Sequence, residues 1–145
     1  MIQIKKMLIE DIDFVCQNEM KFFNTSLGKE MIKQELTTNQ YAFYYVFFDD
    51  EKRIGYLSSW VTIPQAEILN FFIISEYQGR GIGSMMLKSI INEFIKMGVL
   101  EISLEVRASN YVAQRVYEKM GFRKAHIRKE YYHDGEDAIL MLKEV

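Results

Sequence analysis

The 145-residue chain has one cysteine, one proline and two histidines, and each scarcity narrows what it can be. A single cysteine cannot form an internal disulfide, which fits a reducing compartment. Cys16 lies on the apolar stripe of a short amphipathic helix, where we expect a small buried residue and not a nucleophile. His126 and His133 lack the ligand spacing of a metal site, so no metal is expected. No apolar run reaches about 18 residues and no signal-peptide pattern opens the chain, which predicts a cytoplasmic protein with no membrane partner.

An excess of charge of one sign is also missing. Eighteen Lys and Arg against 20 Asp and Glu give a formal net charge of −2, so binding to nucleic acid through bulk electrostatics is not expected. With 49% hydrophobic and 26% charged residues, the composition is that of an ordinary globular protein. The length predicts one domain, residues 1–145, and we expect a monomer or a weak dimer.

Hydrophobic periodicity predicts a series of strands and helices. Strands are expected at 1–7, 41–48, 54–63, 66–74, 100–106, 122–132 and 137–142, and helices at 11–23, 28–36, 83–97 and 111–119. The Asp134-Gly135 pair predicts a tight hairpin across residues 133–136. The order β-α-α-β-β-β-α-β-α-β-β predicts an α/β fold, a mixed sheet of the α+β kind with helices on both faces.

The most specific local signal is the segment 78–84, Gln-Gly-Arg-Gly-Ile-Gly-Ser, between an apolar run and a helix. Its three glycines let the backbone approach a ligand closely, and the helix that follows presents free N–H groups and its positive dipole end. The segment therefore predicts a cradle for the phosphates of a cofactor. It is not a P-loop, because no lysine precedes Ser84, and it lacks the βαβ context of a dinucleotide fingerprint.

This segment resembles the acyl-CoA-binding motif Gln/Arg-x-x-Gly-x-Gly/Ala of the GNAT family of N-acetyltransferases, with Gln78, Gly81 and Gly83 at the defined positions. The family also uses the element order expected here. The resemblance implies the GNAT acyl-CoA N-acyltransferase fold, acetyl-CoA as co-substrate and transfer of an acetyl group to an amine.

Two side chains are suited to that chemistry. Glu105 ends the alternating strand 100–106 on its polar side and is the candidate base; free glutamate is a weak base for an ammonium group, so we expect proton transfer through a water molecule. Tyr117 is the candidate acid for the departing thiolate. From the residues alone, Glu105 can equally be a solvated carboxylate or a partner of Arg107, and Tyr117 a core aromatic. Asn110 is expected to cap the helix 111–119, to contact the cofactor, or both.

Longer stretches resemble one branch of the family, the ribosomal-protein-alanine N-acetyltransferases that modify the small-subunit protein S18. They are Leu-Glu-Val-Arg-Ala-Ser-Asn at 104–110, Val-Tyr-Glu-Lys-Met-Gly-Phe at 116–122, Ile-Arg-Lys-Glu-Tyr-Tyr at 127–132 and Glu-Asp-Ala-Ile-Leu-Met at 136–141. The resemblance covers about residues 70–141. It implies that Glu105 is the general base, Tyr117 the general acid and Asn110 a cofactor contact. The remaining cofactor-binding residues that it implies are Phe71, Phe72 and Ile73 for the pantetheine arm and Gln78, Gly79, Arg80, Gly81, Ile82, Gly83 and Ser84 around the pyrophosphate.

The acceptor side departs from that branch. The branch usually carries Phe-x-Pro-Trp-Ser after its first helix, whereas residues 22–26 read Phe-Phe-Asn-Thr-Ser. The expected hairpin at 133–136 is also short. Tyr131 and Tyr132, expected on a strand that faces the acceptor, are candidates for gripping a peptide, or are ordinary strand aromatics.

These patterns predict direct transfer of acetyl, in a ternary complex, to a protein N-terminal α-amine. The alternatives are a small-molecule amine (a polyamine, an amino sugar or an antibiotic) and a non-catalytic acetyl-CoA-binding module. A polyamine favours an acidic pocket lining, and the strands near Glu105 show no dense acidic cluster in the sequence.

Overall fold

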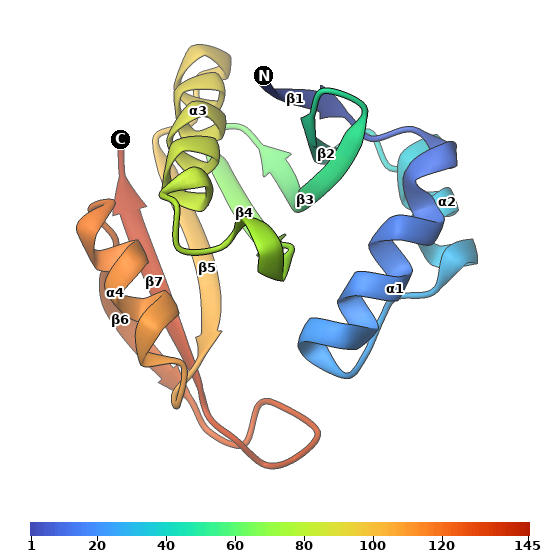
Figure 1. Cartoon of the computed structure of the whole chain (residues 1–145). Coiled ribbons are helices and arrows are strands. Elements are labelled where there is room, and N and C mark those ends of the chain that lie inside the picture. The colour runs from blue at the N-terminus through green and yellow to red at the C-terminus, as the bar shows by residue number, and fades with distance from the viewer. The chain divides into compact units, whose positions relative to one another are not determined.

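The structure is a computed structural model that describes residues 1–145. Its strands are β1 (Ile2–Lys6), β2 (Ala42–Asp49), β3 (Lys52–Thr62), β4 (Gln65–Ile73), β5 (Glu101–Arg107), β6 (Arg123–Arg128) and β7 (Ala138–Glu144). Its helices are α1 (Ile12–Phe23), α2 (Lys29–Thr38), α3 (Ile82–Met97) and α4 (Tyr111–Lys119), with short 3-10 turns at Ile9–Asp11 and Ser75–Tyr77 (Figure 1). The expected order of strands and helices is confirmed.

The strands form one mixed sheet in the order β1-β2-β3-β4-β5-β7-β6. β4 and β5 are parallel, with Glu67 opposite Ser103, whereas β1–β2, β2–β3, β5–β7 and β6–β7 are antiparallel. The predicted α/β class with a mixed sheet is therefore confirmed.

By its internal contacts the chain divides into two compact units, which we describe separately. The first unit comprises residues 1–60 and 70–86, and in it α1 and α2 lie against each other (Figure 1). Phe72 of β4 is at the centre of an aromatic cluster in this unit: its ring centroid lies 5.3 Å from that of Phe22 and 5.5 Å from that of Tyr56. Contacts among these large rings help to stabilise the packing of α1 on its strands.

A buried carboxylate joins α1 to β4 in the same unit. Glu19 is fully buried and accepts hydrogen bonds from Ser26 Oγ (2.9 Å) and Asn70 Nδ2 (2.8 Å). Burial raises the pKa of Glu19, and the two hydrogen bonds oppose that shift. Asn24, within the segment that lacks proline and tryptophan, ends α1 in the left-handed conformation at φ 58°. Cys16 on α1 is partly exposed, so the expectation that it is buried was wrong.

The second unit comprises residues 61–69 and 87–145. Strand β5 alternates as predicted: Ile102, Leu104 and Val106 are buried, while Glu101, Ser103, Glu105 and Arg107 lie on the partly exposed side. Strand β6, at the edge of the sheet, is exposed along its whole length.

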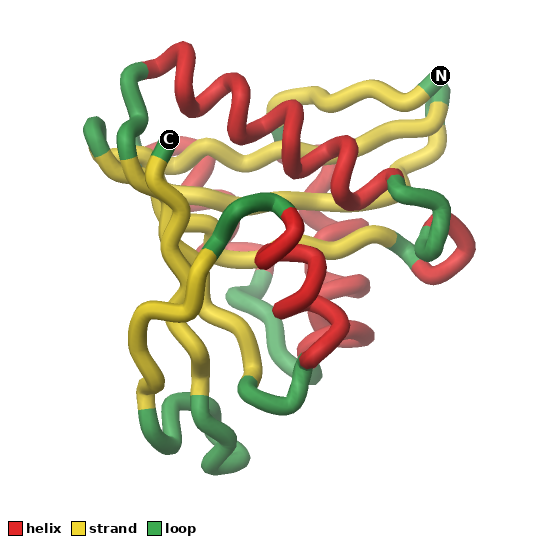
Figure 2. The backbone as a smooth tube through the Cα atoms, turned by 90° about the vertical axis from the view of Figure 1, so that its left-hand side faces the viewer, coloured by secondary structure: helices red, strands yellow, loops and turns green.

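The prediction of a strand over 122–132 was wrong at its end, because β6 stops at Arg128 and the connection to β7 runs over 129–137 (Figure 2). The backbone turns out of the strand at Glu130, which has φ 52°, and the Glu130 N–H donates to Asp137 Oδ1 at 2.9 Å. The Asp137 side chain thus takes the hydrogen bond that a backbone carbonyl would accept if the strand continued. Tyr131 and Tyr132 consequently lie in a loop and not on a strand, and the connection is longer than the hairpin expected at 133–136.

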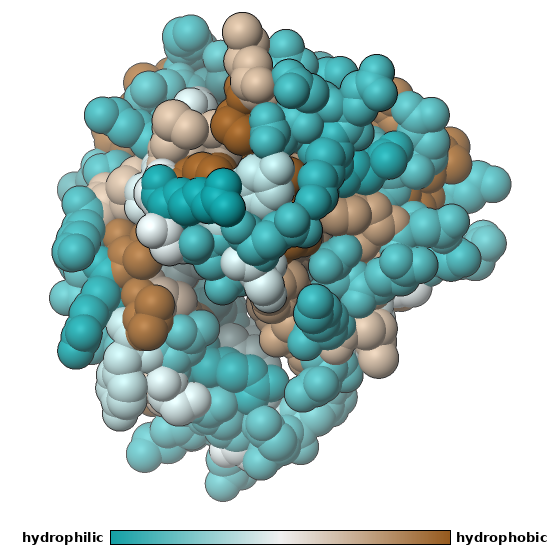
Figure 3. Space-filling view, in the orientation of Figure 1, coloured by the Kyte–Doolittle hydropathy of each residue, from teal (hydrophilic) through white to brown (hydrophobic).

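Hydrophilic side chains cover most of the face seen in Figure 3. No helix is long and apolar enough to cross a membrane. No group of three or more His, Cys, Asp or Glu side chains is placed to hold a metal ion.

Candidate active site

The glycine-rich segment lies in the first unit, between the end of β4 and the start of α3. The Gln78 side chain donates from Nε2 to the Ile73 carbonyl at 2.7 Å, which ties the segment back to β4. Gly79 and Gly81 have φ of 75° and 76°, the left-handed region that side chains with a Cβ rarely adopt. A Cβ built at either glycine meets nothing within 4 Å, so the backbone here borders open space.

Helix α3 begins where this segment ends. Its first turn is closed by the Met85 N–H, which donates to the Gly81 carbonyl at 3.1 Å. The N–H groups of the first turn have no acceptor within a helix and carry its positive end. At Gly83 a Cβ would lie 3.5 Å from Ile73 and 3.6 Å from Phe71, so the helix packs closely against β4 at this point. Open space beside the free N–H groups of a helix is the arrangement that suits an anion such as a phosphate.

The strand residues expected to contact the cofactor are largely engaged in packing. Phe72 and Ile73 are buried, and the Phe71 ring packs edge-on against Phe47 with centroids 6.2 Å apart. What Phe72 and Ile73 can offer to a bound molecule is therefore their backbone groups. Arg80 has its guanidinium 5.1 Å from the Tyr77 ring centroid.

The candidate base Glu105 lies in the second unit, on the polar side of β5. Its side chain is 15% exposed, and Oε1 lies 3.4 Å from Nε of Arg128 on β6. Oε2 is buried and has no hydrogen-bond partner. Glu105 is therefore neither a solvated carboxylate nor the partner of Arg107, two alternatives that the sequence left open. One oxygen is paired with a cation, and the other makes no hydrogen bond.

A second carboxylate near Glu105 was not identified from the sequence. The parallel register places Glu67 of β4 opposite Ser103, and therefore on the same side of the sheet as Glu105. Burial raises the pKa of Glu67, the negative charge of Glu105 raises it further, and Arg128 opposes the shift. The alternation of Ala66, Glu67 and Ile68 showed which way Glu67 points, but only the pairing of β4 with β5 brings it close to Glu105.

The candidate acid Tyr117 is partly buried on α4. Its ring packs against Phe122 in a T-shaped arrangement with centroids 5.8 Å apart. Burial, with a smaller contribution from Tyr132, raises the pKa of Tyr117 to about 12, so the phenol keeps its proton at neutral pH. Asn110 caps α4, with its Oδ1 accepting from the Ala113 N–H at 3.1 Å, as expected from the sequence.

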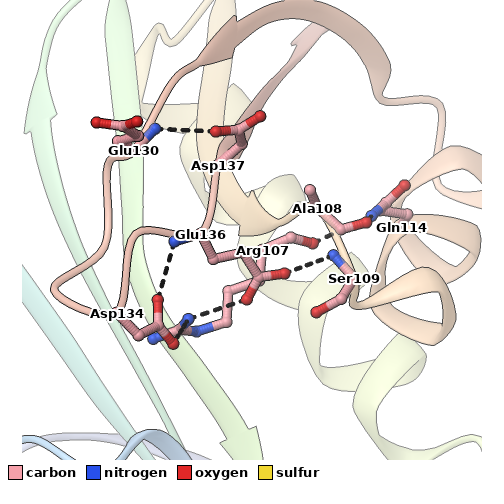
Figure 4. A network of polar contacts seen from close by, with 8 residues as sticks. All are labelled: Arg107, Ala108, Ser109, Gln114, Glu130, Asp134, Glu136 and Asp137. Atoms are coloured by element: carbon pink, nitrogen blue, oxygen red, sulfur yellow. Dashed lines mark hydrogen bonds and ion pairs between the residues drawn. The ribbon is translucent and has the colours of Figure 1, made fainter.

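Arg107 is the centre of a polar network at the end of β5 (Figure 4). Its Nη1 lies 2.8 Å from Asp134 Oδ2 and 3.0 Å from Glu136 Oε1. The other Glu136 oxygen, Oε2, accepts from the Ser109 N–H at 2.8 Å. The Arg107 guanidinium also lies over the Tyr132 ring, 4.0 Å from its centroid.

The two loop tyrosines contact each other and extend this network. Their rings meet in a T-shaped arrangement with centroids 5.1 Å apart. The Arg128 guanidinium lies 5.9 Å from the centroid of the Tyr131 ring. Burial and, to a smaller extent, the Glu105 carboxylate raise the pKa of Tyr131. The structure therefore brings Glu105, Arg128 and Tyr131 together in the second unit.

Comparison with known proteins gives consistent relationships. The chain is 37% identical over 139 residues to a Bacillus subtilis protein provisionally named ribosomal protein bS18-alanine N-acetyltransferase, covering 95% of this chain and 92% of the relative. It is 36% identical over 124 residues to the ribosomal protein bS18-alanine N-acetyltransferase of Escherichia coli, covering 83% and 76%.

The crystal structure of the ribosomal-protein-S18-alanine N-acetyltransferase from Escherichia coli superimposes with a TM-score of 0.90 at 28% identity, covering 100% of this chain and 94% of that one. A profile of the acetyltransferase (GNAT) family matches residues 10–122. With this match, the relatives and the mixed sheet, the chain belongs to the GNAT family of acetyltransferases, whose co-substrate is acetyl-CoA.

Proposed function

We propose that this protein transfers the acetyl group of acetyl-CoA to the N-terminal α-amine of a protein, with an alanine-first ribosomal protein of the bS18 kind as acceptor. The observation that carries the proposal is Glu105, whose buried Oε2 is free while Oε1 is held by Arg128. Two relatives that the chain matches over most of its length bear names for this reaction.

The glycine cradle fits the phosphates of acetyl-CoA, because Gly79 and Gly81 leave open space beside free helix N–H groups. In this proposal residues 78–84 hold the pyrophosphate, Phe71, Phe72 and Ile73 offer backbone groups to the pantetheine arm, and Asn110 makes a further contact. Acetyl-CoA supplies a thioester carbonyl and a thiolate leaving group.

Glu105 then acts on the acceptor. Its Oε2 takes a proton from the ammonium group, directly or through a water molecule, and frees the lone pair that attacks the carbonyl carbon. The new C–N bond forms as the C–S bond breaks, and the Tyr117 hydroxyl gives its proton to the departing sulfur. The attacking nitrogen loses its second proton as the neutral amide forms, and a proton from solvent restores the phenol. An acid that is fully protonated at neutral pH suits this step. No covalent enzyme intermediate is involved.

An α-amine suits this base better than a lysine does. Its pKa of about 7.7–8.0 lies well below the value of about 10.4 for lysine, so less free energy is needed to deprotonate it. We assign Tyr131 and Tyr132 to the acceptor peptide, because Tyr131 packs on Tyr132 and lies beside Arg128, the partner of Glu105.

A small cationic amine is a second candidate, favoured by Glu67. The carboxylates of Glu67 and Glu105 interact on one side of the sheet, and two neighbouring negative charges suit a polyamine as well as an N-terminal ammonium group. A non-catalytic module that only binds acetyl-CoA fits less well, because it needs neither a carboxylate with one buried oxygen left without a hydrogen bond nor a protonated phenol.

The test is CoA release from acetyl-CoA with a matched panel of acceptors. The panel holds an alanine-first peptide, the same peptide blocked at its α-amine, a blocked peptide with one lysine, spermidine and an amino sugar. We expect turnover of the first peptide alone, with a mass gain of one acetyl group at its N-terminus. Turnover of spermidine alone would establish the second candidate, and binding of acetyl-CoA without any turnover would establish the third.

A further inference from the structure

Arg107 has no role in the chemistry proposed above, yet its guanidinium binds two carboxylates and lies over an aromatic ring. It follows Glu105 by two residues on β5, so both side chains leave the same side of the strand. Glu105 nevertheless pairs with Arg128, and Arg107 is directed to the connection 129–137. Of these two neighbouring side chains, Glu105 is thus the candidate base, and Arg107 binds the connection 129–137.

The contacts of Arg107 use properties that lysine lacks. Nη1 bridges the carboxylates of Asp134 and Glu136, and Cζ of the guanidinium lies over the Tyr132 ring, 4.0 Å from its centroid. A flat, delocalised cation can bind two carboxylates and stack on an aromatic ring at once, whereas an ammonium group is a compact, strongly hydrated charge. Arg107 is 35% exposed and Glu136 24%, so this pair is partly shielded from water.

The connection is anchored to the end of β5 at several points. Glu136 Oε2 accepts from the Ser109 N–H, and the Ala108 N–H donates to the Asp137 carbonyl at 3.0 Å. Within the connection, the Tyr132 N–H donates to the Glu136 carbonyl at 3.1 Å. Movement of Glu136 away from Arg107 would therefore carry Tyr132 with it.

The two tyrosines link this anchor to the catalytic candidates. The Tyr132 ring centroid lies 4.0 Å from the Arg107 guanidinium, and Tyr132 makes a small contribution to the raised pKa of Tyr117. Tyr131 packs against Tyr132 and lies 5.9 Å from the guanidinium of Arg128, which pairs with Glu105. Tyr131 is thus joined to Glu105 through Arg128, and Arg107 holds Tyr132, on which Tyr131 packs.

We propose that Arg107 is a positioning residue for the acceptor: by binding Asp134 and Glu136 and stacking on Tyr132, it fixes the connection 129–137 so that Tyr131 and Tyr132 align the acceptor amine with Glu105 and Tyr117. The part concerning the acceptor rests on the proposed function. Arg107 touches neither reacting group itself, so its effect is on alignment and not on proton transfer.

The experiment compares Arg107→Lys with Arg123→Lys, an exposed arginine of β6 that pairs with Glu144 and lies outside the network. For Arg107→Lys we expect kcat/KM for the peptide to fall roughly 10–100-fold, since a misplacement of about 1 Å costs that much, while KM for acetyl-CoA stays the same. Arg123→Lys should match the parent protein in every measurement. Unchanged peptide kinetics in Arg107→Lys would overturn the proposal.

A second readout does not depend on activity. Trypsin cuts after Arg128 and Lys129, where the connection begins, so the initial rate of cutting there reports how firmly the connection is held. We expect faster cutting in Arg107→Lys and Glu136→Gln, at an unchanged melting temperature, and no further increase when the two are combined. Equal rates of cutting in the parent and the variants would overturn the proposal that Arg107 fixes the connection. Additive effects of Arg107→Lys and Glu136→Gln would overturn it too. If the parent acetylates no peptide but the rates of trypsin cutting change as expected, the proposed function fails, while the role of Arg107 in fixing the connection stands.

Discussion

Glu105 binds Arg128 through one carboxylate oxygen only, at 3.4 Å, and its other oxygen is buried without a partner. A buried oxygen without a hydrogen bond costs free energy, which a purely structural ion pair would avoid by using both oxygens. The arrangement is suited to a group that must exchange a proton with a bound molecule.

Glu105→Gln should keep the fold and the affinity for acetyl-CoA but lower turnover by roughly 10²–10⁴-fold, the usual contribution of a general base. The amide has the same shape and cannot take the proton. Raising the pH should restore part of the rate, because more of the amine is then neutral. Steady-state kinetics and calorimetry with acetyl-CoA check this, with Glu101→Gln on the same side of β5 as the control. Near-full turnover of Glu105→Gln at neutral pH would make Glu105 structural.

Glu67→Gln should raise KM for a cationic acceptor by roughly threefold to tenfold with a smaller effect on kcat, because one of two attracting charges is lost. The variant should also be more stable at neutral pH. The pKa of folded Glu67 is raised, so its contribution to stability is present at low pH and is lost as the pH rises through that pKa. The gain in melting temperature should therefore shrink on going from pH 7 to pH 4. An unchanged KM would remove Glu67 from acceptor binding.

Gly81→Val should abolish binding of acetyl-CoA. A β-branched residue is strained at φ 76°, and its side chain would fill the open space beside the cradle. Gly28→Val is the matched control, since Gly28 has φ 87° and equally open surroundings but precedes α2. Calorimetry on both variants separates the loss of a binding site from the cost of backbone strain. If Gly81→Val and Gly28→Val bound acetyl-CoA with equal affinity, residues 78–84 would not be its binding site.

Tyr117→Phe should lower turnover by about 10–10³-fold, with KM for acetyl-CoA nearly unchanged, because only the hydroxyl is removed and the packing on Phe122 remains. Tyr111→Phe on the same helix, where the side chain is exposed, is the control. Normal turnover of Tyr117→Phe would show that the thiolate leaves without help.

We also expect Tyr117→Phe to change how the stability of the protein depends on pH in the alkaline range. The pKa of folded Tyr117 is about 12 against about 10 in an unfolded chain, so its contribution to stability is complete below pH 10 and is lost as the pH rises towards 12. Tyr117→Phe should lose less stability over that interval. Melting temperatures between pH 9 and pH 12, with tyrosinate absorbance recorded in parallel, test the shift. Identical pH dependences of stability would contradict it.

The sequence predicted features that depend on local pattern. The strict alternation of β5 placed Glu105 on its polar side, and the three glycines of residues 78–84 marked a loop between a strand and a helix. What it could not predict depends on the pairing of distant segments. Arg128 and Glu67 come near Glu105 only through the register of the sheet, which no single strand encodes.

The boundary of β6 was missed for a different reason. Tyr131 and Tyr132 have high β-propensity, and the Asp134-Gly135 pair is a strong hairpin signal, so local preference favoured a long strand. The positive φ of Glu130 and the hydrogen bond from its N–H to Asp137 overrode that preference. The residue types Glu and Asp alone do not predict this hydrogen bond or the positive φ.

The connection 129–137 closes on itself through four hydrogen bonds, from Glu130 to Asp137, from Tyr132 to Glu136, from Gly135 to Tyr132 and from Glu136 to Asp134. A segment that carries its own bonds can change in sequence without shifting the register of the strands on either side. Replacement of this one segment, with Arg107 retained, is thus a route by which the same strand framework could be adapted to other amine acceptors. The connection is accordingly the place to graft residues when a new acceptor preference is to be engineered.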